Sequence, residues 1–224
     1  MSDFIAKFQQ DFIESDRYLY LLRGLGNTLL ITALAVILGI VLGFLVAIVR
    51  STHDKHGGLK ILNVICKVYL TIWRGTPTMV QLLIMYYIIL VALDNKILVA
   101  VIAFGLNSAA YVAEIVRSGI HAIDPGQREA AKALGMPWHL EMLRIVAPQA
   151  TKICILPLVN QFIATIKNTS ILSAITLTEL TREGTLIAYN SFHYFEPYIA
   201  VAVLYLILTT IFTQIAGVLE RRMA

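Results

Sequence analysis

The chain has 224 residues, of which 58% are hydrophobic and only 14% are charged, and its formal net charge is +4. A soluble domain is nearer half apolar and a quarter charged, and a globule of this size cannot bury such an excess of apolar residues. The composition excludes an ordinary soluble enzyme, a disordered protein and a secreted disulfide scaffold. It predicts an all-α polytopic membrane protein that forms a single domain over residues 1–224. No nucleic-acid partner is expected, because the basic residues cluster in short loops beside apolar runs.

Four segments have the roughly 20 mostly apolar residues that a membrane-spanning helix needs. In chain order they are Leu25–Val49, Leu98–Val116, Ile153–Ile175 and Tyr198–Leu219. They leave the region between residues 58 and 93 to be assigned.

Residues 58–93 contain two shorter apolar pieces, separated by Arg74-Gly75-Thr76-Pro77. The first piece, Leu59–Trp73, carries Lys60, Asn63 and Lys67, and this mixture favours a shallow interfacial helix that leaves Arg74 near the headgroups. Pro77 is expected to begin the second piece, Thr78–Leu93, as the true crossing. The sequence therefore predicts five transmembrane helices.

The distribution of charge sets the orientation of these five helices. Basic residues dominate the loop after the first span, the long loop after residue 116 and the C-terminal Arg221-Arg222, whereas the N-terminal stretch and residues 179–197 are acidic. By the positive-inside rule, the N-terminus lies outside and the C-terminus in the cytoplasm.

The cytoplasmic loop 118–151 is too long to be a simple connector. Gln127–Leu134 is rich in helix formers and Gly135 is a typical helix stop. Pro137 is expected to open a second helix, which Pro148 ends or kinks. The loop is therefore predicted to form a helix-turn-helix on the cytoplasmic face.

This loop also carries a recognisable motif. Glu129-Ala130-Ala131, followed at fixed spacing by Gly135, Ile145 and Pro148, resembles the EAA loop of membrane subunits of bacterial ABC importers, with Ala147 where leucine is usual. Arg74-Gly75-Thr76-Pro77 with Met79, Val80 and Gln81 is similar to the corresponding segment of polar amino acid permeases. Residues 107–114 add a third similarity, and the resemblance covers residues 20–222.

The resemblance implies a type I ABC importer permease fold in the bacterial cytoplasmic (inner) membrane. Glu129, Ala130, Ala131 and Gly135 would couple this chain to a cytoplasmic ATP-binding subunit, present in two copies, that binds ATP and Mg. Other expected partners are an extracytoplasmic solute-binding protein, membrane lipid and a second permease subunit, either the same chain or a paralogue. The chain has no Gly-x-x-x-x-Gly-Lys-Ser/Thr loop, so it is expected to be non-catalytic, with no cofactor or metal of its own.

Polar residues in the fourth span are the first candidates for a substrate pathway. Their spacing places Gln161, Thr165, Asn168 and Thr169 on one helix face. Polar groups at this depth usually face a cavity or a partner helix, so packing between helices is the alternative interpretation. In the third span, Asn107, Ser108 and Tyr111 share a face and rank second. Two other residues have expected structural roles: Arg74 either anchors at the headgroups or binds loop carbonyls, and Glu114 pairs with Arg117.

The expected substrate is a polar neutral amino acid, glutamine first and glutamate or cystine next. Relatives that carry arginine or histidine place acidic groups near the positions of Gln161 and Asn168, which are neutral here. A self-sufficient secondary carrier or channel is the alternative, and an intramembrane enzyme is a third. The carrier is disfavoured because no internal repeat is evident, and the enzyme because no catalytic pair is found at depth.

Overall fold

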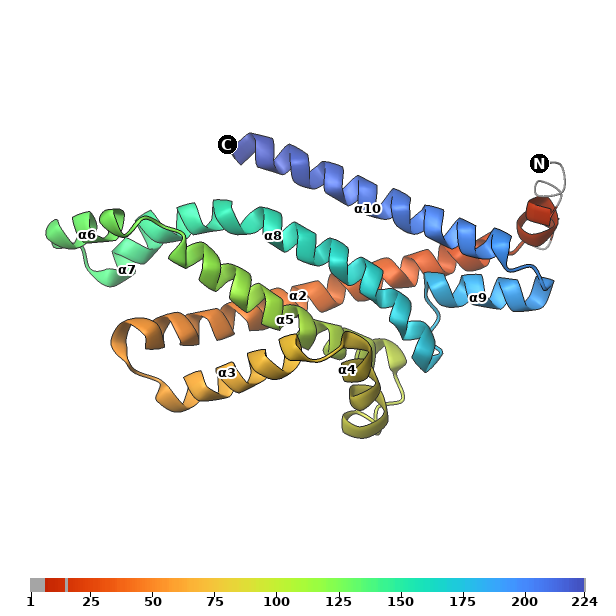
Figure 1. Ribbon diagram of the computed structural model, residues 1–224, viewed down its shortest axis with the longest axis horizontal. Helices are drawn as coiled ribbons and strands as arrows, with labels where there is room; N and C mark the ends of the chain where they lie inside the picture. Colours follow the sequence, from red (N-terminus) through yellow and green to blue (C-terminus); the bar gives the residue numbers. More distant parts are fainter. Residues whose placement is uncertain (1–6, 15, 224) are drawn as a thin grey trace.

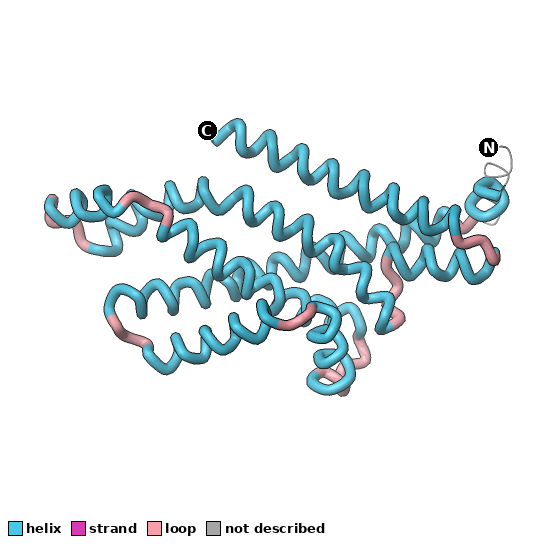
Figure 2. The backbone as a smooth tube through the Cα atoms, in the orientation of Figure 1, coloured by secondary structure: helices cyan, strands magenta, loops and turns pink. Residues whose placement is uncertain are grey.

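The computed structural model describes residues 7–14 and 16–223, and every regular element in this part of the chain is helical. The helices lie largely side by side along the long axis of the molecule (Figure 1), joined by short loops (Figure 2). The α-helices are α2 (Tyr18–His56), α3 (Lys60–Gly75), α4 (Thr78–Ile84), α5 (Lys96–His121), α6 (Pro125–Ala133), α7 (Trp138–Glu141), α8 (Ala147–Asn168), α9 (Leu180–Ser191) and α10 (Phe195–Met223). The π-helical segments are η1 (Gln9–Glu14), η2 (Met85–Ile89) and η3 (Met142–Val146), and η4 (Thr169–Ile175) is a 3₁₀ helix.

Four continuous helical stretches are long and apolar enough to cross a membrane: Tyr18–Asp54, Lys96–His121, Trp138–Ile175 and Phe195–Arg221. All four predicted long spans are confirmed, and each extends beyond its apolar run. Pro148 lies inside the third stretch, so it does not end the helix. The π-helical turn η3 comes directly before α8 and its early proline, which allows the chain to continue although proline cannot donate a backbone hydrogen bond.

The segment Leu59–Trp73, predicted to lie shallow at the interface, forms most of α3, which packs against α5. In Figure 1, α3 runs back alongside α2 and α5, and the Tyr69 hydroxyl donates to the carbonyl of Leu106, near the middle of α5. Leu70 packs against Ala110 and Ala113 of α5. The shorter apolar stretch Thr78–Ile89 follows α3, with a corner at Arg74–Pro77.

The polar residues that suggested an interfacial helix have other surroundings in the structure. Asn63 is buried. Lys67 lines a hollow of about 460 Å³ together with Arg50 and Arg74. Ile61, Val64 and Ile72 are exposed over more than half of their surface, so the amphipathic pattern of α3 reflects an exposed apolar face and a polar face turned to the basic hollow.

The most extensive helix pair is α2 with α5, and glycines allow its close approach. A Cβ atom on Gly39 would lie 2.6 Å from the Cβ of Ser108, and one on Gly43 would lie 2.7 Å from the Cβ of Val112. Real Cβ atoms do not approach this closely, so the two helices touch through backbone and small side chains, as membrane helix pairs commonly do.

Replacing Gly39 with alanine should therefore lower the stability of the protein by about 1–3 kcal/mol, the usual cost of overpacking. The matched control is Gly26→Ala in the same helix, where an added Cβ meets nothing within 4 Å. The stability of both variants is measured in mild detergent by titration with SDS, which unfolds the protein. Equal stability of the two variants would contradict the close contact, and Ser108→Gly should partly rescue Gly39→Ala.

Candidate functional site

The helices α6 and α7 form an elbow beyond the ends of α2 and α5, at one end of the molecule (Figure 1). Asp124 caps α6 by accepting a hydrogen bond from the N–H of Gly126 at 2.8 Å, and Pro125 supplies the first helical position. Gly135 has φ of +71°, a conformation that a residue with a side chain adopts only at a cost. Pro137 then precedes α7, so the predicted helix-turn-helix is confirmed.

The four residues of the predicted coupling motif lie on this elbow in different environments. Glu129, Ala130 and Gly135 are exposed, whereas Ala131 is buried against the rest of the elbow. An ion pair between Arg128 and Glu141 joins α6 to α7, with 2.9 Å between Nε and Oε1, and Glu141 is buried. The elbow is therefore a fixed unit that presents Glu129 and Ala130 outward.

The corner between α3 and α4 is held by the side chain of Gln81. Its amide nitrogen donates to the carbonyls of Trp73 and Thr76, at 2.9 and 3.0 Å, and lies 2.7 Å from the Thr76 hydroxyl. Its carbonyl oxygen accepts from the amide of Asn107 in α5 at 2.8 Å. Gln81 thus satisfies backbone groups that the break between the two helices leaves open. Gly75 and Pro77 form the exposed turn itself.

Arg74 contacts two side chains of α5. Its guanidinium lies 3.3 Å from the Glu114 carboxylate in the second half of α5 and 6.0 Å from the centre of the Tyr111 ring. The expected Glu114–Arg117 pair was therefore wrong: Arg117 instead pairs with Asp54 of α2 at 3.3 Å. Both acids have partners that are distant in sequence, which local spacing could not reveal.

The predicted polar face of α8 divides into two environments. Thr165 and Thr169 are buried, and their hydroxyls donate to the carbonyls of Gln161 and Ile166 within their own helix. Gln161 and Asn168 are half-buried. Because α8 ends at Asn168, Thr169 belongs to the tighter η4 turn and leaves the common face. The two amides are thus the members of this set that keep some exposed surface.

The predicted polar residues of α5 also divide into buried and exposed members. Asn107 and Ser108 are buried, the first bonded to Gln81 and the second at the contact with Gly39. Tyr111 is exposed over 36% of its surface, beside Arg74. The structure therefore brings Tyr111 together with Arg74 at the edge of the basic hollow, and the sequence reasoning missed Arg50 and Lys67 as members of that hollow.

Glu179 is a buried residue that the sequence reasoning counted only as loop charge. It caps α9: its carboxylate accepts from the N–H groups of Thr181 at 2.8 Å and Arg182 at 2.6 Å. The Tyr205 hydroxyl in α10 donates to the same carboxylate at 3.1 Å. Glu179 stands directly before α9 and accepts hydrogen bonds from the first N–H groups of that helix. Its further bond to Tyr205 ties α9 to α10.

The turn before α9 is also hydrogen-bonded to α2. The Thr28 hydroxyl accepts from the N–H of Leu180 at 3.2 Å, and the Asn27 amide donates to the carbonyl of Thr178 at 2.8 Å. A Cβ on Gly24 would lie 2.9 Å from the Cα of Leu180. The start of α9 is therefore a junction at which α2 and α10 meet.

Stability should fall as pH rises because burial raises the pKa of Glu179 from its ordinary value of 4.5 to about 7, outweighing the hydrogen bonds that favour its ionised form. The unfolded chain releases this proton first, so the loss begins near pH 4.5 and is complete above about pH 7. Its size is on the order of 3 kcal/mol. Glu179→Gln should lack this loss, as unfolding measured between pH 4.5 and 7.5 would show. Parallel curves for both proteins would contradict the prediction.

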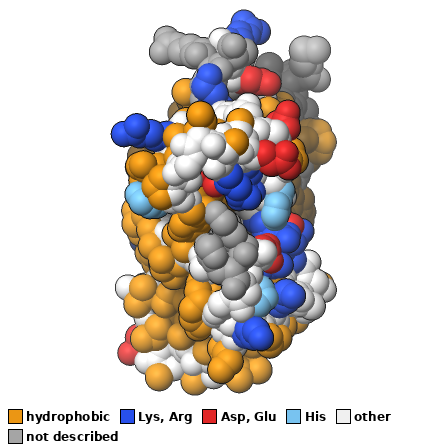
Figure 3. Space-filling model, turned by 90° about the vertical axis from the view of Figure 1, so that its left-hand side faces the viewer, with side chains coloured by type: hydrophobic (Ala, Val, Ile, Leu, Met, Phe, Trp, Pro, Cys, Tyr) orange, Lys and Arg blue, Asp and Glu red, His pale blue; other side chains and the backbone are white. Residues whose placement is uncertain are grey.

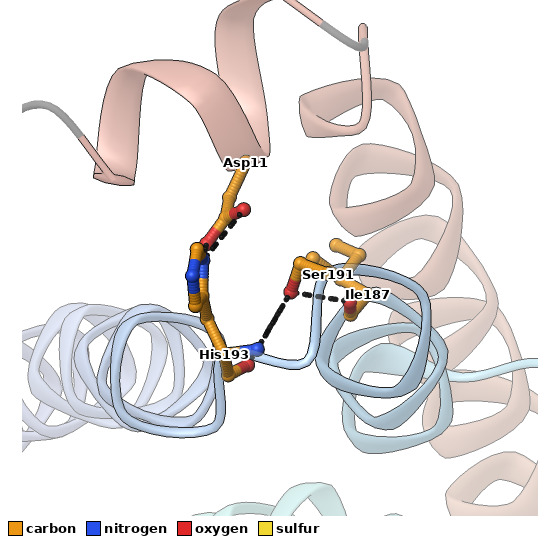
Figure 4. A network of polar contacts seen from close by, with 4 residues as sticks. All are labelled: Asp11, Ile187, Ser191 and His193. Atoms are coloured by element: carbon orange, nitrogen blue, oxygen red, sulfur yellow. Dashed lines mark hydrogen bonds and ion pairs between the residues drawn. The ribbon is translucent and has the colours of Figure 1, made fainter.

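The N-terminal segment η1 docks at the same end of the molecule. Phe12 packs with Leu180, Ile187 and Val201. Figure 4 shows Asp11 pointing at the ring of His193, with 2.9 Å between Oδ2 and Nδ1, while the Ser191 hydroxyl lies between the Ile187 carbonyl and the His193 backbone. His193 thus fixes the N-terminal segment to the α9–α10 turn.

Comparison with known proteins decides the family. The model of the binding-protein-dependent transport system inner membrane component family matches residues 39–224. The chain belongs to this family. It is also 37% identical over 211 residues to a putative glutamine transport system permease protein of Rickettsia prowazekii, which covers 92% of this chain and 94% of the relative. With the arginine transport system permease protein ArtQ of Bacillus subtilis it shares 36% identity, over 91% and 92% of the two chains.

Two solved structures are similar to this permease over nearly its whole length. One, described as an amino acid ABC transporter with histidines, superposes with a TM-score of 0.86 at 36% identity and covers 94% of this chain and 98% of that one. The other, a MetNI methionine ABC transporter in inward-facing conformations, shares the fold, with a TM-score of 0.78 at 20% identity over 92% and 97%. The chain is thus a polar amino acid ABC permease of the inner membrane, and the predicted type I importer fold is confirmed.

Proposed function

We propose that this permease carries a polar neutral amino acid, glutamine first, and that its elbow transmits the stroke of a cytoplasmic ATP-binding subunit. The observation that carries the coupling role is the position of the elbow: a braced helix pair lies at one end of the molecule, past the ends of α2 and α5, and presents Glu129 and Ala130 outward. The elbow carries the EAA motif, which couples the permease to its ATPase in the family that the sequence resembles. Two ATP-binding subunits, a second permease chain and a solute-binding protein would complete the importer.

The preference for a neutral substrate rests on the half-buried amides of Gln161 and Asn168. Neutral donors and acceptors can bond to a side-chain amide without a counter-charge. The basic hollow with Arg50, Lys67 and Arg74 would favour the carboxylate that every amino acid carries. In this proposal the N-terminus and Glu179 lie outside, and the elbow and the C-terminus lie in the cytoplasm.

Uptake by proteoliposomes that contain the permease, its ATP-binding subunit and the cognate binding protein tests the substrate. Unlabelled glutamine should suppress uptake of labelled glutamine at least tenfold, a difference of about 1.4 kcal/mol, at concentrations where lysine and arginine do not. Competition by lysine and arginine alone would overturn the neutral-substrate proposal. Uptake that continues without ATP would instead favour a secondary carrier.

A further inference from the structure

A continuous groove runs between α2, α5 and the α7–α8 stretch, on the side of the elbow. It consists of three adjoining cavities of about 290, 380 and 120 Å³. The first two share Ser51, Ile120 and Trp138, and the second and third share Phe44, Val116 and Met142 among others. The two inner cavities are lined mainly by apolar side chains, whereas the outermost is polar.

The polar end of the groove contains charges of both signs. Arg128 and Lys132 line it, and so do Asp54 and Glu129, with His121 beside them. Asp54 also contacts Arg117 at 3.3 Å and His121 at 3.9 Å. Figure 3, which looks onto this end of the molecule, shows basic, acidic and histidine side chains close together among apolar ones. A purely anionic ligand would meet two carboxylates here, whereas a zwitterion finds a partner for each charge.

The depth of this polar pocket matches the headgroup layer of a bilayer. The apolar runs of α2 and α5 end at Val49 and Val116, and Asp54 and His121, a few residues further along each helix, line the pocket. The apolar cavities lie beside Phe44, Ile48 and Val116, within the spans. A ligand in the whole groove would therefore have its polar part at the membrane surface and its apolar part at acyl-chain depth.

We propose that the groove binds one phospholipid whose headgroup carries both a phosphate and a primary ammonium, as in phosphatidylethanolamine. The phosphate would lie by Arg128 and Lys132, where cationic donors suit its oxygens. The ammonium would lie by Asp54, and an acyl chain would fill the apolar cavities. Basic pockets between membrane helices on the cytoplasmic side are known places of headgroup binding. Such a lipid would touch both the spans and the elbow.

The test is lipid retention by the permease purified with its ATP-binding subunit. The complex is exchanged into nanodiscs of equal phosphatidylethanolamine, phosphatidylglycerol and phosphatidylcholine, and bound lipid is identified by native mass spectrometry after release. Phosphatidylethanolamine should be enriched about fivefold over phosphatidylcholine, because methylation removes the hydrogen-bond donors of the ammonium. Equal retention of the three lipids, or preference for phosphatidylglycerol, would overturn the proposed headgroup.

Matched tryptophan variants test the position. Ser51→Trp fills the junction of the outer two cavities and should lose the enrichment, whereas Ile37→Trp, at an exposed position of the same helix outside the groove, should retain it. Lys132→Met removes a headgroup partner at an exposed position and should lower retention even where Ser51→Trp fails to fold. Unchanged retention in Lys132→Met and Ser51→Trp would overturn the site. No transport or ATP is needed, so these outcomes are separate from those that test coupling.

Discussion

Reversing the charge of Glu129 should reduce ATP-driven amino acid uptake at least tenfold, a loss of about 1.4 kcal/mol or more in the docked state. Glu129 is exposed on the elbow, so its replacement by lysine leaves the fold of the permease intact. In the proposed complex this side chain meets the ATP-binding subunit, and a charge of the wrong sign in an interface costs several kcal/mol. Uptake and co-purification of the ATP-binding subunit are the two measurements.

The control for this variant is Glu220→Lys near the end of α10, which makes the same charge change at another exposed position. It should leave both uptake and co-purification near the level of the unchanged protein. If Glu129→Lys retained full uptake, or if both variants failed alike, the elbow would not be the coupling element. A loss of uptake with normal assembly would place the role of Glu129 in force transmission and not in affinity.

The elbow could be predicted from sequence because its determinants are local. Gly135 and Pro137 each act within a few residues, through a positive φ and a fixed φ, and the structure uses both as expected. The long spans were predictable for a similar reason, since a run of apolar residues fixes the helix and its length together. Only their ends were missed, because the helices continue past the apolar runs.

The course of α3 could not be predicted because its polar face has two physical explanations. Lysine and asparagine at helical spacing suit a membrane surface, but they equally suit a hollow inside a transporter. The position of α3 is fixed by contacts of Tyr69 with Leu106 and of Arg74 with Glu114. In both contacts the two residues are more than 35 positions apart in the sequence. Periodicity identifies a face, but it does not identify what the face meets.

The polar residues of α8 show the same limit at a finer scale. Spacing placed Thr165 and Thr169 with Gln161 and Asn168, but both threonines are buried whereas both amides are only half-buried. Threonine hydroxyls can donate to their own helix, so they tolerate burial without a ligand. The amides have no such local solution, and they are the members of the set left half-buried. The two side-chain types could therefore have been distinguished by chemistry.

Replacing Gln81 with leucine should destabilise the permease by about 3 kcal/mol, because it leaves buried polar groups without partners. The amide of Asn107 loses its acceptor, and the carbonyls of Trp73 and Thr76 lose their donor. The corner between α3 and α4 would then be free to change its angle, which moves Arg74 away from Glu114. Unfolding by SDS titration measures the loss, and uptake in proteoliposomes should fall with it.

A double-mutant cycle separates the lost partner from the lost packing. Adding Asn107→Leu to Gln81→Leu removes the stranded amide, so the double variant should be more stable than the sum of the two single losses by about 1 kcal/mol or more. Gln214→Leu, at an exposed position of α10, is the control for the chemical change alone and should cost little. Additive losses in the cycle would mean that Gln81 and Asn107 act independently and that the corner is held by its backbone alone.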